Sequence, residues 1–402
     1  MALNTVSSDR LSTNVKNTNF TAAEKQDLTD DIKPLLGSSG GGNKNLIING
    51  AMQVAARATS STTSGYGDLD RWKHEYAGTD EAPTFAQSAV VSSDSGDNPF
   101  AKGITNCTKI TNGNQTGGFQ NNRLLNFNQN IEAQNVRNSG WNYNSSSSFL
   151  TLSYYVKASV SQEYFGFIKT VDGTNYIYPF SLGTLTANTW TKITKTIPGN
   201  SNLQIDDDAN SGFQVFPIFF GGTDYTDSGV TNDAWATWSS GSRSEDQPSS
   251  WWTTNDSTIE ITGIQLEVGS VATDFEHRSF AQELALCQRY FYMHASGAES
   301  SSTGAQAPIG LGYGYTSSDC YLVVKYPVTM RAYPSMSKVV GTDYFGFFYN
   351  NNSAFPDNVA NNRVATNSAE IYFYGGASWD QNAGGMVRVA NSATRLGFSA
   401  EL

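Results

Sequence analysis

Residues 150–156 read LTLSYYV, an alternation of apolar and polar side chains that is typical of a β-strand with one face against a core. Successive side chains of a strand point to opposite faces, so Leu150, Leu152, Tyr154 and Val156 share one of them. We expect that face to contact a hydrophobic core. The stretch therefore predicts one strand of a packed β-sheet.

Short strands of the same kind are predicted on the C-terminal side of this stretch, at residues 163–169, 176–182, 190–197 and 213–220. Residues 172–175, which read DGTN, suit a hairpin turn between the first two of these. Successive short strands with turns between them, from about residue 45 to 276, are typical of a β-sandwich or jelly roll.

The last strand of this region, residues 259–268, changes phase in its middle. Ile259 and Ile261 lie in one phase, whereas the apolar residues after Gly263 lie in the other. Those later residues are Ile264, Leu266 and Val268. A β-bulge at Gly263 would turn all five side chains toward the core.

The composition agrees with a mostly β protein. The 402 residues include 37 Gly, 20 Tyr and 22 Phe, and only 15% of them are charged. Aromatic residues cover the faces of strands, while glycine and short polar residues form turns. The length suggests two to three domains, at about 150 residues each.

The formal net charge of -11, with no cluster of basic residues, argues against nucleic-acid binding. Cys107, Cys287 and Cys320 have neither disulfide-framework nor zinc-site spacing, so they are expected to be reduced and buried. The first eleven residues lack a signal-peptide pattern, and no run reaches the roughly 18 apolar residues of a membrane span. We expect synthesis in a cytoplasm and no membrane insertion.

Residues 1–36 predict a short amphipathic helix, because a capping box begins at Thr21 and an apolar stripe follows it. The stripe consists of Leu28, Ile32, Leu35 and Leu36. A helix this short needs a partner surface, so we interpret the segment as an attachment segment. The alternative is a tail that packs on its own domain. Residues 37–44 form a Gly/Ser linker.

Residues 279–299 are expected to form a connecting helix and loop, since Ser279 and Gln282 make a second capping box. Residues 300–402 are expected to form a smaller C-terminal β-sandwich module. Its strands are predicted at residues 320–326, 339–349, 370–374, 386–390 and 395–398.

Five short motifs resemble those of a known family. They are residues 45–50 (NLIING), 70–72 (DRW), 265–273 (QLEVGSVAT), 275–278 (FEHR) and 283–290 (ELALCQRY). In this order they resemble the carbohydrate-binding-module-like jelly roll of many tailed-phage tail fibres and other virion structural proteins, over residues 45–292. Ala51 stands where an acidic residue is often found, and Asp274 where proline is common.

The resemblance implies a jelly-roll domain over residues 45–278 in a structural subunit of a virion. It implies a tail fibre or spike, displayed as a homotrimer, that adsorbs to host-surface glycans without catalysis. Residues 1–36 would then bind other virion proteins. A head fibre or capsid decoration protein has the same anatomy, and a polysaccharide-degrading tailspike enzyme is a third interpretation.

Glycan recognition uses flat aromatic faces flanked by polar groups. Four tryptophans crowd a stretch that lacks strand alternation, namely Trp235, Trp238, Trp251 and Trp252. They are the candidate glycan-binding residues. The alternative is that they fix a long insertion to the sandwich or fill a subunit interface.

No cofactor is predicted. The aspartates of residues 206–208 and 94–98 could supply oxygen ligands to a structural calcium ion, but they do not match the twelve-residue calcium loop. His74, His277 and His294 have no zinc-site spacing. No nucleophile elbow or phosphate-binding loop is evident, so no enzyme activity is expected.

Overall fold

The structure is a computed structural model that describes residues 44–299 and 307–402. The predicted attachment helix, with Leu28, Ile32, Leu35 and Leu36, lies outside the described residues, as do residues 37–43 of the linker. The described part is mostly β, which confirms the predicted fold class.

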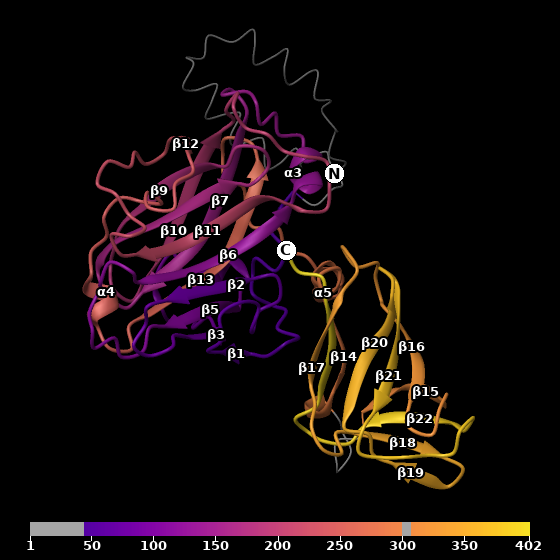
Figure 1. Ribbon diagram of the computed structural model, residues 1–402. Helices are drawn as coiled ribbons and strands as arrows, with labels where there is room; N and C mark the ends of the chain where they lie inside the picture. Colours follow the sequence, from indigo (N-terminus) through magenta and orange to yellow (C-terminus); the bar gives the residue numbers. More distant parts are fainter. Residues whose placement is uncertain (1–43, 300–306) are drawn as a thin grey trace, which may run out of the picture. The chain divides into compact units, whose positions relative to one another are not determined.

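Two antiparallel sheets form the jelly roll (Figure 1). The first contains β1 (Ser60–Ser61), β3 (Thr84–Ala89), β4 (Ser95–Gly96), β5 (Asn106–Thr111), β7 (Phe149–Ala158), β10 (Thr189–Pro198) and β13 (Thr258–Val268). The second contains β2 (Lys73–Ala77), β6 (Leu124–Glu132), β8 (Gln162–Thr170), β9 (Tyr176–Leu185), β11 (Ser211–Gly221) and β12 (Ala236–Thr237). Their strand orders are β1-β3-β5-β13-β7-β10-β4 and β12-β9-β8-β11-β6-β2, and only β4 and β10 pair in parallel.

Strand β7 contacts the core as its alternation predicted. Leu150, Leu152, Tyr154 and Val156 are buried between the two sheets. The opposite face of β7 is also covered, and there the Tyr155 ring belongs to a second, smaller hydrophobic cluster. This central strand is therefore buried on both faces.

The predicted β-bulge is present in β13. The pairing of β13 with β7 shifts between Thr262 and Gln265, and Gly263 adopts a left-handed φ of 63°. A side chain at Gly263 would lie 2.8 Å from Ile104 and 2.9 Å from Tyr155.

The bulge places the apolar residues on both sides of it in the core, namely Ile259, Ile261, Ile264 and Leu266. The prediction was wrong for Val268, which is 40% exposed because β13 ends there.

Three α-helices occur in the described residues: α3 (Ala133–Arg137), α4 (Ser250–Thr253) and α5 (Phe280–Gln288). Helix α5 begins with the predicted capping box, in which Ser279 Oγ accepts a hydrogen bond from the Gln282 amide. No helix in the described ranges is both long and apolar enough to cross a membrane. The three cysteines are buried and free, as predicted.

The C-terminal module contains two more sheets. A three-stranded sheet, β14-β23-β17, is built from β14 (Phe291–Ser296), β17 (Ser335–Val339) and β23 (Arg395–Ser399). The other contains β15 (Pro308–Gly314), β16 (Cys320–Lys325), β18 (Phe345–Tyr349), β19 (Asn352–Ala354), β20 (Asn358–Val364), β21 (Ser368–Tyr374) and β22 (Gly384–Val389). Its order is β19-β18-β22-β15-β16-β21-β20.

Two details differ from the sequence-based expectation. The strand predicted at residues 339–349 is divided between β17 and β18, because the chain turns at Asp343, whose φ is 58°. Residues 291–296, expected in the connection, form β14 and pair with β23.

Candidate functional site

The long loop between β11 and β13 covers part of the outer face of the six-stranded sheet. Phe167 and Ile177 point outward from β8 and β9, because their neighbours Ile168 and Tyr178 point into the core. Together with Phe216 and Phe219 they form a small apolar cluster, against which Trp238 of the loop packs.

Trp238 fixes this loop to the sheet. Its amide donates a hydrogen bond of 2.9 Å to the Asn175 carbonyl. The Lys169 ammonium lies 4.0 Å from the centroid of its ring, and the Arg243 guanidinium lies 5.2 Å from it. Such cation–π contacts are favourable, so the ring already has protein partners.

Trp251 and Trp252 belong to the main core, with exposed fractions of 0% and 1%. The Trp251 ring stacks on Phe220 with centroids 4.2 Å apart, and its Nε1 donates to the Thr258 carbonyl at 3.0 Å. Neither ring offers a face to a ligand. The prediction that these two tryptophans bind glycan is therefore corrected: both are packing residues.

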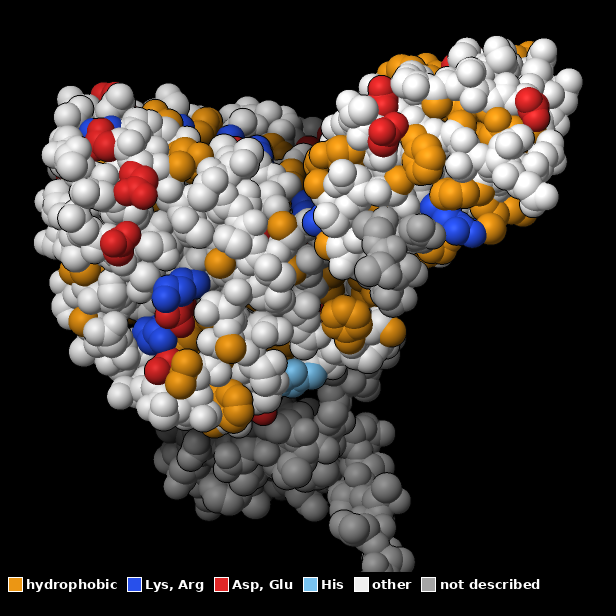
Figure 2. Space-filling view, turned by 90° about the horizontal axis from the view of Figure 1, so that it is seen from below, with side chains coloured by type: hydrophobic (Ala, Val, Ile, Leu, Met, Phe, Trp, Pro, Cys, Tyr) orange, Lys and Arg blue, Asp and Glu red, His pale blue; other side chains and the backbone are white. Residues whose placement is uncertain are grey.

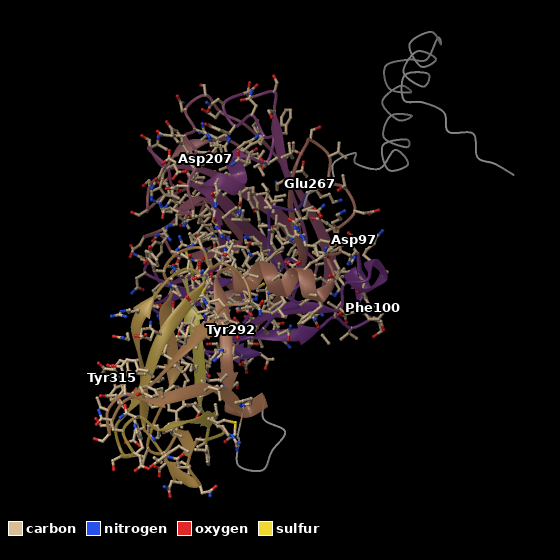
Figure 3. All side chains as sticks on the ribbon, turned by 90° about the vertical axis from the view of Figure 1, so that its right-hand side faces the viewer. Asp97, Phe100, Asp207, Glu267, Tyr292 and Tyr315 are labelled. Carbon is tan, nitrogen blue, oxygen red and sulfur yellow. The ribbon has the colours of Figure 1, made fainter. Side chains whose placement is uncertain are left out.

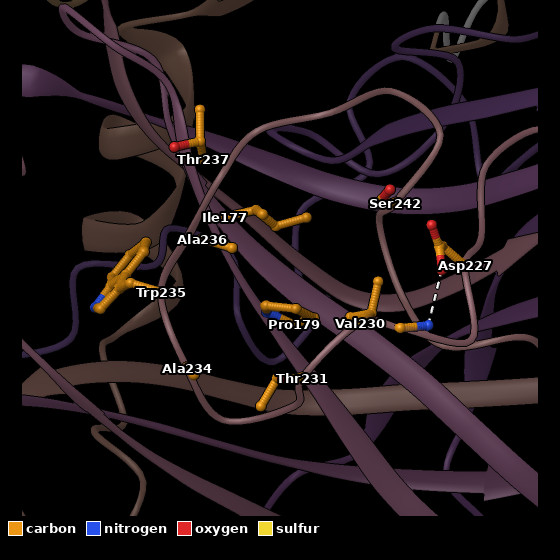
Figure 4. A pocket seen from close by; sticks show the side chains of 11 residues that line it. Ile177, Pro179, Asp227, Val230, Thr231, Ala234, Trp235, Ala236, Thr237 and Ser242 are labelled. Carbon is orange, nitrogen blue, oxygen red and sulfur yellow. Dashed lines mark hydrogen bonds between the residues drawn. The ribbon is translucent and has the colours of Figure 1, made fainter.

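Trp235 is the remaining tryptophan of the four, and it borders an open cavity of about 430 Å³ (Figure 4). It is half-buried, its ring lies edge-on to Tyr178 at 5.3 Å, and its Nε1 donates to the Pro198 carbonyl at 2.7 Å. These contacts hold the indole in one orientation beside the cavity.

The cavity combines apolar and polar walls. Ile177 and Pro179 of β9 and the Trp235 ring are apolar, while the polar lining includes Asp227 and Ser242. Asp227 accepts a hydrogen bond of 2.7 Å from the Gly229 amide (Figure 4). The volume falls within the roughly 300–1,000 Å³ of small-ligand sites, and one aromatic face with polar neighbours suits a sugar ring.

Sequence patterns did not identify most of these lining residues. Ile177 and Pro179 are outward residues of β9, and the alternation of that strand could have indicated their direction. Asp227 and Ser242 belong to irregular loop segments, in which no periodic pattern predicts the direction in which a side chain points.

The candidate calcium-binding aspartates have protein partners. Asp94 accepts hydrogen bonds from Trp190 Nε1 and from the Lys157 ammonium. Asp207, labelled in Figure 3, accepts one of 3.1 Å from the Asn138 side chain. Within residues 44–299 and 307–402, no three His, Cys, Asp or Glu side chains are grouped in a way that could hold a metal ion.

The five motifs that carry the family resemblance meet in one buried joint. The Arg278 guanidinium donates to the Ile47 carbonyl at 3.0 Å, and Trp72 Nε1 donates to the Asn49 carbonyl at 3.0 Å. The Asn49 amide donates to a Glu283 carboxylate oxygen of α5. The motif residues thus connect α5 to the jelly roll.

The same joint contains a buried ion-pair cluster. Arg71 lies 3.4 Å above the Tyr290 ring and pairs with Glu401, which also receives Arg57 Nη2 at 2.9 Å. Asp70 is fully buried next to this cluster, 3.7 Å from Arg57.

Asp70 gives the joint a predictable pH dependence. Burial raises the pKa of Asp70 to about 7, although Arg57 and the Ala56 amide act in the opposite direction. Because the folded-state pKa exceeds the unfolded one, the protonated form stabilises the fold fully below about pH 4 and this stability is lost as the pH rises to about 7.

Asp70→Asn carries no charge at this position and should not lose this stability. As the pH rises from about 4 to about 7, its free energy of unfolding should increase by about 2–4 kcal/mol relative to that of the natural chain, as measured by urea unfolding at each pH. Asp207→Asn, in an exposed turn, is the control, and parallel pH profiles for the Asp70 variant and the natural chain would contradict the prediction.

Comparison of the sequence with protein-family models and with curated proteins finds no match. Solved structures give distant similarities. One is the enzymatically active domain of tailspike protein 4 of bacteriophage CBA120, with 11% identity over 56% of this chain and 22% of that chain, at a TM-score of 0.29. Another is a protein of Bacteroides thetaiotaomicron assigned a sugar-binding role, with 14% identity over 56% of this chain and all of that chain, also at 0.29.

A third is the tandem of two family 22 carbohydrate-binding modules from Paenibacillus barcinonensis Xyn10C. It has 9% identity over 91% of this chain and 100% of that chain, at a TM-score of 0.27. These scores are too low to support an argument about function, which has to come from the residues of the site.

Proposed function

We propose that this chain is a structural subunit of a tailed-phage virion, a tail fibre or spike whose β-sandwich adsorbs to a host-surface glycan without catalysis. The observation that carries the binding role is the cavity beside Trp235, with its apolar walls and polar lining. A sugar ring has an apolar C–H face for the indole and hydroxyl groups for Asp227 and Ser242. The motif resemblance over residues 45–292 supports the virion role.

The single carboxylate in the described lining of the cavity favours binding over hydrolysis. Glycoside hydrolysis ordinarily needs two carboxyl groups on opposite sides of the scissile bond. The described lining contributes one, that of Asp227, which is held by the Gly229 amide. Incubation with host polysaccharides tests this: chain shortening that one carboxylate substitution abolishes would instead establish a polysaccharide-degrading spike.

Replacing Trp235 by alanine is expected to weaken glycan binding by at least about tenfold, because the variant loses the aromatic wall of the cavity. The measurement is an array of bacterial surface glycans followed by titration calorimetry with the oligosaccharide that binds best. Tyr333→Ala, which removes an exposed aromatic side chain from the C-terminal module, is the control and should bind like the natural chain. Equal affinity for the Trp235 variant would exclude this cavity as the binding site.

The C-terminal module supports the proposed homotrimer. Leu311, Val323 and Met386 are exposed by 80%, 60% and 43% on neighbouring strands of its larger sheet. Exposed hydrophobic side chains of the module are visible in Figure 2, and Tyr315 lies at its outer edge in Figure 3. A contiguous apolar face of this kind is typical of a subunit interface.

Light scattering on the full chain, and on a chain that starts at Asn43, tests the trimer. A monodisperse monomer for the full chain would contradict it. Electron cryomicroscopy of the intact particle distinguishes a tail fibre from a head fibre or capsid decoration, because density for the subunit lies either on the tail or on the capsid.

A further inference from the structure

A row of outward-facing polar side chains continues from the cavity across the six-stranded sheet. Ile177, in the cavity wall, pairs with Lys169 on β8, which pairs with Gln214 on β11, and Gln214 pairs with Asn130 on β6. Directly paired residues of neighbouring strands lie on the same face. Lys169 therefore lies next to the Trp235 cavity, on the same face.

Several cationic side chains lie on the face of the sheet next to the Trp235 cavity. The Arg243 guanidinium follows the cavity residue Ser242 and, like Lys169, contacts the Trp238 ring. Lys73 on β2 adds a third cation, and the carboxylate that interacts with these groups is Glu75, 2.6 Å from Lys73. The three cations outnumber the two carboxylates described here, Glu75 and Asp227 of the cavity wall, so the site is locally positive on a chain whose net charge is -11.

The charges here are only partly neutralised. Burial, together with the charge of Arg243, lowers the pKa of Lys169. Burial raises the pKa of Glu75, but its interactions with Lys73 and Asn126 outweigh this, and the net pKa is lowered. Glu75 is thus an ionised partner already engaged by Lys73, and Lys169 would gain from a second anion.

Two buried amides in the same face have free acceptor oxygens. Asn126 and Asn128 point outward from β6, because Phe127 between them points into the core. Their exposed fractions are 0% and 2%, and among the described residues neither Oδ1 has a hydrogen-bond partner. An unpaired buried acceptor is unfavourable, so a donor such as a sugar hydroxyl would be bound favourably there.

The side chains next to these amides can move aside. Lys73 and Glu75 pair across the strands with Asn128 and Asn126, and their side chains are 32% and 36% exposed. Ion pairs between partly exposed side chains are weak, so a ligand that replaces this pair would lose little.

We infer that the glycan bound by this face is acidic: a sugar in the Trp235 cavity is followed by a carboxylate-bearing sugar, uronic or sialic. That sugar contacts Lys169 and Arg243 through its carboxylate, and its hydroxyl groups donate hydrogen bonds to Asn126 Oδ1 and Asn128 Oδ1. This inference rests on the proposed glycan-binding function. It adds the chemical class of the ligand.

The test compares fragments of polygalacturonate, polysialic acid and hyaluronan, each in its native form and with its carboxyl groups reduced to alcohols. For at least one of them, calorimetry should show the native fragment binding about tenfold more tightly than the reduced one at about 50 mM salt. The difference should shrink at about 500 mM salt, because salt screens the contact with Lys169 and Arg243.

Lys169→Met should remove this preference, because the native fragment loses its contact with the ammonium group while the reduced fragment has no carboxylate to lose. Lys102→Met deletes an exposed lysine elsewhere in the chain, and is the control that should keep the preference. Equal affinity for native and reduced fragments would overturn the inference while leaving glycan binding intact. Absence of binding to every fragment, native or reduced, would overturn the inference and count against the proposed function itself.

Discussion

Replacing Trp251 by alanine is expected to lower the free energy of unfolding by about 3–5 kcal/mol. The side chain is fully buried, stacks on Phe220 and donates a hydrogen bond to Thr258, so its removal leaves a large cavity and an unpaired carbonyl. Urea unfolding followed by circular dichroism measures the change.

The matched control for this variant is Trp235→Ala. Trp235 is half-buried, so its loss should cost about 1–2 kcal/mol, roughly one hydrogen bond and part of a ring contact. The two variants therefore separate a packing tryptophan from a ligand-binding one. If Trp251→Ala unfolds like the natural chain and loses glycan binding instead, the assignment of the two residues is reversed.

Arg71→Met is expected to cost about 3–5 kcal/mol, because it leaves the Glu401 carboxylate in a buried site without its closer partner. Arg71 is 1% exposed, lies 3.4 Å above the Tyr290 ring and donates to the Asn130 carbonyl. Chemical unfolding gives the loss of stability. Limited proteolysis after residue 290 should become faster, since the same substitution loosens the joint.

A second substitution distinguishes loss of charge pairing from loss of packing. Combining Arg71→Met with Glu401→Leu removes both charges, and a buried ion pair replaced by apolar side chains is often nearly neutral. The double variant should therefore be more stable than Arg71→Met alone. If the two variants are equally stable, the unpaired carboxylate costs little and the loss in Arg71→Met comes from packing of the guanidinium on Tyr290. If the double variant is less stable, the lost pair between Glu401 and Arg57 outweighs the relief of the unpaired charge.

Alternation along the chain predicted the long strands well, because β7, β8 and β11 each place a buried side chain at every second position over part of their length. The bulge at Gly263 was also predictable, since a change of phase beside a glycine is characteristic of a strand with one extra residue. Two-residue strands such as β1 and β12 were missed, because they are too short for a period to be seen.

The candidate site was predicted less completely. Composition located four tryptophans in one stretch, but it could not show that the single turn of α4 directs Trp251 and Trp252 inward. Only the contacts seen in the structure distinguish the roles of Trp235 and Trp238. Two cations lie against the Trp238 ring, whereas the Trp235 ring borders the open cavity. Such differences depend on contacts between distant segments, which a local pattern does not contain.

The ion pair between Arg71 and Glu401 joins residues 330 positions apart in the chain. During synthesis, a jelly roll that has emerged as far as β13 contains Arg71 before its carboxylate has been translated. Contacts of such high sequence separation slow folding, because a long loop has to be closed before they form. We therefore expect the joint to form among the last steps of folding, after the C-terminal module has been translated.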